Sequence, residues 1–132
     1  MDTLILILIG SWSLIIIFFS AVIAPTVFKA VDENSAGLFL RAFFPKYYYF
    51  GIFLGAVSLA LGIAQSLGIM GLIIISLMIL LTIISIYLIP LINDARDSEE
   101  AGKLRFKRLH LLSVILNFII LILGIYYVYW GI

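Results

Sequence analysis

Cysteine is absent from this 132-residue chain, and charged residues make up only 11% of it. Without thiols the chain can form no disulfide, no thiolate nucleophile and no cysteine-rich metal site. So little charge provides no basic surface of the size that nucleic acids require, so no nucleic-acid partner is expected. The first residues also lack the basic segment that opens a secretory signal. The apolar stretch that follows them is therefore interpreted as a retained helix.

Hydrophobic residues make up 65% of the chain, far above their share in soluble domains. Four apolar runs reach or exceed the roughly 18 residues that a bilayer-spanning helix needs. These predicted spans cover about residues 4–28, 47–67, 69–92 and 109–130. The sequence therefore predicts an all-α, integral membrane four-helix bundle that forms a single domain over residues 1–132, with membrane lipids around it.

Basic residues occur in only two places, both of them connections between predicted spans. The first connection has three and the second has five: Lys29, Arg41 and Lys46, then Arg96, Lys103, Arg105, Lys107 and Arg108. Short loops rich in lysine and arginine stay on the cytoplasmic side of a membrane. We therefore expect both termini outside, both charged connections in the cytoplasm, and a multi-pass protein of the bacterial inner membrane.

The first charged connection has a helical pattern of its own. Asn34 or Ser35 can cap a short amphipathic helix that carries Arg41. Pro45 is expected to end this helix before the chain turns into the second span. The tyrosines at 47–49 would then lie at headgroup depth as interfacial anchors. We predict a short interfacial helix between the first and second spans.

The second charged connection contains a helix start. Asp97 and Glu100 have the spacing of a capping box, so the last helix is expected to begin near Ser98. Arg96 lies just before it and is expected either to reach lipid phosphate or to be neutralised by Asp94 or Asp97.

Small residues form a stripe on the second span at helical spacing. Such stripes let helices approach closely, and packing within the chain is favoured here over a dimer seam or a ligand groove. A homo-oligomer or a larger membrane complex stays open as the alternative. The stripe consists of Gly51, Gly55, Ser58 and Gly62, and a similar face on the first span, expected to meet it, includes Ser13, Ser20 and Ala24.

Two polar tracks run along the third and fourth spans toward their charged ends. Polar groups in hydrocarbon are costly unless they face protein, water or ligand, so the two tracks are expected to face each other. His110 then either bonds to Asn93 or Ser113 or has a ligand or proton-transfer role. We predict a cytoplasm-facing pocket lined by Asn93, Arg96, Lys107, His110, Ser113 and Asn117, with Arg41 beside it.

The predicted spans contain no acidic residue and no nucleophile motif, so a carboxylate relay or hydrolysis is disfavoured, and so is enzymatic activity in general. Guanidinium and amide donors suit a small anionic or amphiphilic solute or lipid, which the protein would bind or help to move. Two alternatives stay open: an accessory subunit that acts by helix packing, and a redox protein that binds haem or porphyrin through His110. No other cofactor is predicted.

Several short segments also form a pattern found in a family of small membrane proteins. They are residues 24–28 (Ala-Pro-Thr-Val-Phe), residues 44–48 (Phe-Pro-Lys-Tyr-Tyr), Asn93 with Arg96, Phe106 with Leu109 and His110, and Ser113 with Asn117. Together they resemble the transmembrane protein 205-like family over nearly the whole chain. The resemblance implies a four-span helical protein of poorly defined activity, whose vertebrate member is linked to platinum-drug resistance and vesicle-associated export. Its family-like positions are Pro25, Phe28, Pro45, Asn93, Arg96, His110 and Asn117.

Overall fold

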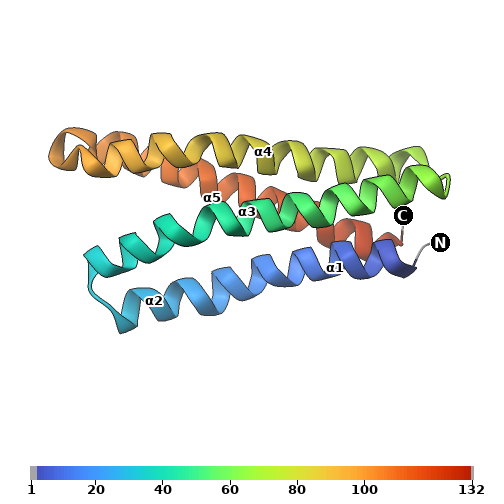
Figure 1. Ribbon diagram of the computed structural model, residues 1–132, viewed down its shortest axis with the longest axis horizontal. Helices are drawn as coiled ribbons and strands as arrows, with labels where there is room; N and C mark the ends of the chain where they lie inside the picture. The colour runs from blue at the N-terminus through green and yellow to red at the C-terminus, as the bar shows by residue number, and fades with distance from the viewer. Residues whose placement is uncertain (1–2, 132) are drawn as a thin grey trace.

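A computed structural model of the chain describes residues 3–131, which are almost entirely helical. The elements in chain order are α1 (Thr3–Phe18), η1 (Phe19–Ile23), α2 (Ala24–Ala30), α3 (Glu33–Ala64), α4 (Ile69–Asp97) and α5 (Glu99–Trp130). The first three follow one another without a break, so this part of the chain forms four long helices (Figure 1). Each of the four is long and apolar enough to cross a membrane. The predicted all-α membrane four-helix bundle is confirmed.

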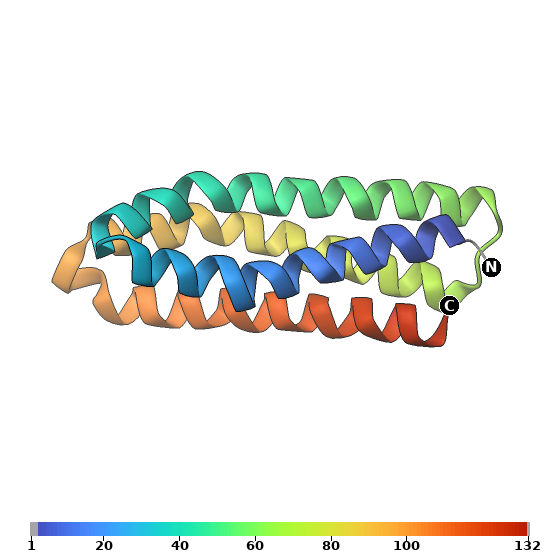
Figure 2. The same ribbon diagram turned by 90° about the horizontal axis from the view of Figure 1, so that it is seen from below.

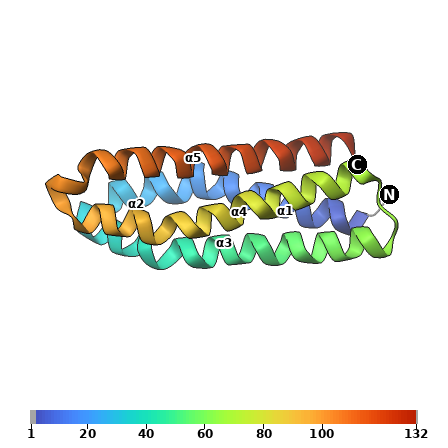
Figure 3. The same ribbon diagram turned by 90° about the horizontal axis from the view of Figure 1, so that it is seen from above.

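The two ends of the bundle differ in charge. Both termini and the α3–α4 turn lie at one end, and the α2–α3 and α4–α5 turns lie at the other (Figures 1, 2 and 3). Every lysine and arginine belongs to the half of a helix nearest the second end, which we call the charged end. The helices thus separate the basic residues from the termini.

A π-helical turn, η1, joins α1 to α2 just before Pro25. Pro25 has no N–H, and in a regular α-helix its ring would press against the carbonyl of Ala21. The turn widens instead, and the Ala24 N–H bonds to the carbonyl of Phe19. Turns of this kind inside α-helices are frequent at functional sites. Here the widened turn brings Phe19 and Ser20 onto the wall of a cavity.

The predicted interfacial helix is not a separate element, because α3 is continuous from Glu33 to Ala64. Its N-cap is Asp32, whose carboxylate accepts the Ser35 N–H at 2.7 Å, so the prediction of Asn34 or Ser35 as the cap is wrong. The Ser35 N–H holds the pKa of the Asp32 carboxyl below its usual value. Residues predicted to lie along the membrane surface therefore form the first turns of a long spanning helix.

Aromatic packing keeps α3 helical through Pro45. The Phe19 ring of η1 contacts Phe43, Phe44 and Tyr47, with ring centroids 5.1–5.2 Å apart. These contacts offset the backbone bond that Pro45 removes, which is why the predicted helix end at this residue is wrong.

The continuous helix also changes the depth of the tyrosines in α3. Tyr47 and Tyr48 lie about four turns inside α3 and are 8% and 3% exposed. They are core residues, so their prediction as interfacial anchors is wrong. Tyr49 differs, because its side chain is exposed.

The α4–α5 turn is the tightest connection in the described chain. Ser98 alone joins the two helices, and Glu99 follows with a left-handed φ of 50°. Gly102 lies so close to the Ala95 carbonyl that a β-carbon at this position would overlap it. The predicted start of the last helix near Ser98 is confirmed, and the glycine is what allows α5 to fold back directly onto α4.

The small stripe on α3 holds an aromatic ring of α1. A β-carbon on Gly51 would lie 2.6 Å from Trp12 Nε1, and one on Gly55 would lie 2.8 Å from the same indole. The same β-carbon on Gly55 would lie 2.7 Å from Ile79 Cγ1 of α4. Ser58 is fully buried one turn further along. These residues therefore pack against helices of the same chain.

The small residues of the first span do not meet this stripe, so that expectation is wrong. Trp12 occupies the stripe, while its neighbour Ser13 lies against Gly124 of α5. Ser20 and Ala24 line the cavity instead. At the far end of the stripe, a β-carbon on Gly62 would meet leucine side chains of the α3–α4 turn and α4 at 3.1 Å.

Replacing Gly51 with alanine tests this packing. We expect Gly51→Ala to lower the free energy of unfolding in detergent by about 1–3 kcal/mol, because the new methyl group overpacks the Trp12 indole. Gly10→Ala is the matched control, since Gly10 also lies inside a helix and a β-carbon there would meet only Val128 Cγ2, at 3.8 Å. Adding Trp12→Phe to Gly51→Ala should recover part of the loss. Equal stability of the two alanine variants would contradict the packing.

Candidate functional site

A cavity of about 730 Å³ lies in the charged half of the bundle, a volume typical of small-molecule sites. All four long helices contribute to its wall. The wall is apolar toward the middle of the bundle, where Ile16, Ile17 and Leu121 lie. Toward the charged end it becomes polar, with Asn93 and Arg96.

Six of the seven residues predicted for the pocket line this cavity, namely Arg41, Asn93, Arg96, His110, Ser113 and Asn117. Lys107 does not. Phe106 and His110 lie one turn apart on α5 and both face the cavity. Lys107 follows Phe106 directly, so its side chain is rotated by about 100° around the helix from that of Phe106 and is exposed outside the wall.

Two tyrosines of α3 tie down the polar residues in the middle of α5. The Tyr47 hydroxyl donates to Asn117 Oδ1 at 3.0 Å, and the Tyr48 hydroxyl lies 3.2 Å from Ser113 Oγ. Sequence reasoning missed these partners, although a tyrosine hydroxyl inside an apolar span requires one. Ser113 and Asn117 therefore hold α3 and α5 together, in addition to lining the cavity.

His110 takes part in stacking rather than in the predicted hydrogen bond to Asn93 or Ser113. Its ring lies parallel to Phe106, with centroids 5.8 Å apart and planes at 7°. Within residues 3–131 its imidazole has no hydrogen bond to another side chain, and no three His, Asp or Glu side chains gather there as a metal site. The ring nitrogens of His110 are available to a molecule in the cavity.

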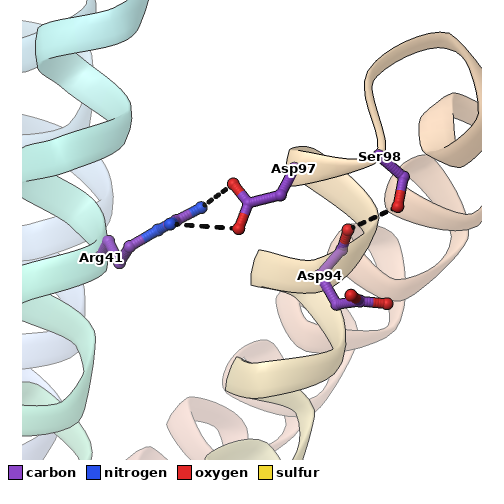
Figure 4. Close-up of polar contacts among 4 residues, drawn as sticks. All are labelled: Arg41, Asp94, Asp97 and Ser98. Atoms are coloured by element: carbon purple, nitrogen blue, oxygen red, sulfur yellow. Dashed lines mark hydrogen bonds and ion pairs between the residues drawn. The ribbon is translucent and has the colours of Figure 1, made fainter.

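Asp97 binds Arg41, which joins the end of α4 to α3 (Figure 4). The guanidinium reaches both carboxylate oxygens, at 2.7 and 3.4 Å. Bidentate pairs of this kind fix geometry as well as charge. No side chain caps α5, so the predicted capping box of Asp97 with Glu100 is wrong.

Asp94 likewise has partners other than Arg96. Its carboxylate pairs with Arg105 of α5 at 2.7 Å, and its main-chain carbonyl accepts the Ser98 hydroxyl (Figure 4). Both acids that were predicted to neutralise Arg96 are thus bound to other arginines. Across residues 3–131, Arg96 has no carboxylate within 4.0 Å.

Arg96 is held by uncharged neighbours on two sides. Its guanidinium carbon lies 5.0 Å from the centroid of the Phe106 ring, a cation–π contact. On the other side it lies against Gly37 of α3, where a β-carbon would come within 2.6 Å of Nη1. Sequence reasoning missed Gly37, because nothing local marks a glycine whose neighbour is 59 residues away. Glu33 is the acidic side chain on the wall, in the exposed first turn of α3.

Exchanging the charges of Arg41 and Asp97 tests the link between α3 and α4. We expect Arg41→Asp to lower the thermal midpoint in detergent by at most about 4 °C, because the pair is partly exposed. High salt should remove the difference. The double variant Arg41→Asp/Asp97→Arg should recover the midpoint, and a double variant as unstable as the single one would show that the pair contributes nothing.

Comparison with known proteins groups the chain with proteins of undetermined role. A family model described as "Domain of unknown function (DUF4149)" matches residues 7–101, which include every cavity residue of α1 to α4. An uncharacterised protein from Aquifex aeolicus (strain VF5) is 32% identical over 111 residues, covering 80% of this chain and 77% of that protein. No solved structure matches the chain. The chain belongs to the DUF4149 family and is a small membrane-type helical bundle.

Proposed function

We propose that this protein binds a small anionic amphiphile in the cavity, with the charged head on Arg96 and the apolar part along the deeper wall. The observation that carries the proposal is that Arg96 lies on the cavity wall without an ion-pair partner in the described chain. Its guanidinium lines the cavity, is positioned by Phe106 and Gly37, and has no acidic partner within residues 3–131. A guanidinium that no carboxylate binds directly keeps its hydrogen-bond donors available to an anionic ligand.

The other charges near the cavity single out Arg96. Arg41 also lines the wall, but its charge is balanced by Asp97. Glu33 lies in an exposed turn, where water solvates its carboxylate. Of the two arginines on the wall, Arg96 is therefore the one with no carboxylate within 4.0 Å among residues 3–131, and His110 and Asn93 add hydrogen-bonding groups beside it.

The apolar part of the wall explains why the ligand is amphiphilic. A free inorganic anion would contact only the polar end and leave the deeper surface around Ile16, Ile17 and Leu121 unfilled. A ligand with an alkyl chain covers both parts. Burying the chain adds about 25 cal/mol for each Å² of apolar surface removed from water.

We further propose that the charged end faces the cytoplasm, as the positive-inside rule requires of a bundle whose lysines and arginines all belong to one half. In a bacterial cell this places the protein in the inner membrane, with the cavity open to the cytoplasmic leaflet. A reporter enzyme that works only outside the cytoplasm should then be active when it is fused to the C-terminus.

Loss of the Arg96 charge tests the proposed function. We expect the protein purified in mild detergent to carry a bound anionic amphiphile detectable by native mass spectrometry. Arg96→Ala should lower its occupancy about tenfold or more, because charge-assisted hydrogen bonds contribute about 1.5–3 kcal/mol. Lys107→Ala removes an equal charge from α5, outside the cavity wall, and should leave occupancy unchanged.

Two results would contradict the proposal. In one, Arg96→Ala and His110→Ala both fold, with unchanged thermal midpoints, and retain every copurifying molecule. In the other, the absorption spectrum of the purified protein shows a Soret band that His110→Ala removes, which would assign the cavity to haem or porphyrin instead.

A further inference from the structure

We infer that the ligand is a phospholipid of the leaflet at the charged end, and that it enters the cavity sideways through a slit between α2 and α5. The inference rests on the proposed function and adds to it the source of the ligand and its route. The slit is where the cavity meets the outer surface of the bundle, between α5 and the part of the first long helix that follows α1, whereas α1 itself packs against α5.

The slit arises because the first long helix leaves α5 as it approaches the charged end. α5 packs against α1, but within the described chain no α-carbon of η1 or α2 comes within 8 Å of one in α5. α2 still has α-carbons within 8 Å of some in α3, whereas the described η1 residues have none. Figure 1 shows the α1–α2 helix leaning away from α5 toward the charged end. The divergence begins at η1, the widened turn that Pro25 imposes.

Apolar side chains form both edges of the slit. Ile17, in the last turn of α1, and Phe28 of α2 lie on one edge, and Val114 and Phe118 of α5 lie on the other. Each lines the cavity and yet is at least 41% exposed on the outer surface. Because they belong to helices long enough to span a membrane, this outer surface faces acyl chains. An apolar rim admits a lipid chain and opposes a hydrated ion.

The cavity has the depth of one leaflet. Its wall on α5 runs from Phe106 to Leu121, a rise of about 22 Å at 1.5 Å per residue. Half of a typical bilayer, with its headgroup region, is about 20–22 Å. The polar end of the cavity lies toward the charged end and the apolar end toward the middle of the bundle. A lipid can thus move in without leaving its leaflet or turning over.

The charge of Arg96 matches a lipid phosphate. A guanidinium fork binds phosphate oxygens in pairs, and Arg96 lies at the polar end, toward which headgroups of that leaflet point. Free phosphate and soluble alkyl phosphates share this head chemistry, but they would enter from water at the charged end and would have no need of the slit. Entry through the slit is what distinguishes a lipid from these alternatives.

The absence of cysteine allows the slit to be closed chemically. Ala21→Cys and Val114→Cys place one thiol on each side, and a bismaleimide then bridges them. The control pair, Ala60→Cys and Ile73→Cys, bridges exposed positions of α3 and α4 away from the cavity. Each protein is reconstituted in phosphatidylethanolamine vesicles and given phosphatidylglycerol with a photoactivatable acyl chain. Dodecyl phosphate, added from water, is the second probe.

We expect the photoactivatable lipid to label the wall near Ile17 and Leu121 in the unbridged protein and in the bridged control. Bridging the slit should reduce this labelling about tenfold and leave dodecyl phosphate binding in place. Equal lipid labelling with the slit bridged and open, still dependent on Arg96, would overturn the route and leave the proposed function standing. Absence of any Arg96-dependent binding of either probe would instead overturn the proposed function.

The bridge itself could disturb the cavity and abolish the binding of both probes. In that case a narrower slit gives a second version of the test. Leu111→Trp, one turn before Val114 on the exposed side of α5 and outside the cavity wall, adds bulk beside the α5 edge of the slit without a cross-link. Slower lipid labelling with unchanged dodecyl phosphate binding then supports lateral entry. Unchanged lipid labelling, or an equal loss of both probes, counts against it.

Discussion

Hydrocarbon supplies no hydrogen-bond partner, so a polar group in the apolar part of this bundle has to find one within the protein. The hydroxyls of Ser58, Thr82 and Ser85 each bond to a carbonyl one turn back on their own helix. Tyr47 finds its partner across the bundle in Asn117. Nearer the charged end, Arg96 lies against the Phe106 ring and Gly37 and has no carboxylate within 4.0 Å among residues 3–131. The polar groups of the apolar part are thus satisfied within the protein, while the guanidinium at the end of the cavity has no direct ion pair in the described chain.

The arginines near the cavity have different roles, although composition alone treats them as equal. Arg41 and Arg105 bind Asp97 and Asp94, and these pairs join helices at the charged end. Because both acids are bound elsewhere, Arg96 has no carboxylate within 4.0 Å in the part of the chain that the structure describes. The cavity around it depends on the π-helical turn at η1, since α2 diverges from α5 beyond that turn. A proline-imposed irregularity and two ion pairs together create a cationic, partly apolar site.

Much of the fold could be predicted from local patterns. Long apolar runs mark the segments that cross a membrane, and the placement of lysine and arginine marks the ends of these segments. Helical spacing also brought Asn93, Arg96 and His110 to one wall. What the sequence could not indicate depends on distant contacts. α3 passes through Pro45 because Phe19 of another helix supports it. Gly37 was invisible for the same reason, since only the folded chain brings Arg96 against it.

The central claim is that the Arg96 guanidinium holds a lipid phosphate, and a nuclear distance tests it most directly. Solid-state NMR of the ¹⁵N-arginine protein in phosphatidylglycerol vesicles measures dipolar coupling between lipid ³¹P and guanidinium ¹⁵N. The account predicts a coupled guanidinium signal that disappears in Arg96→Lys and survives in Arg41→Lys. A spectrum in which the Arg96 nitrogens show no coupling to phosphorus would contradict it.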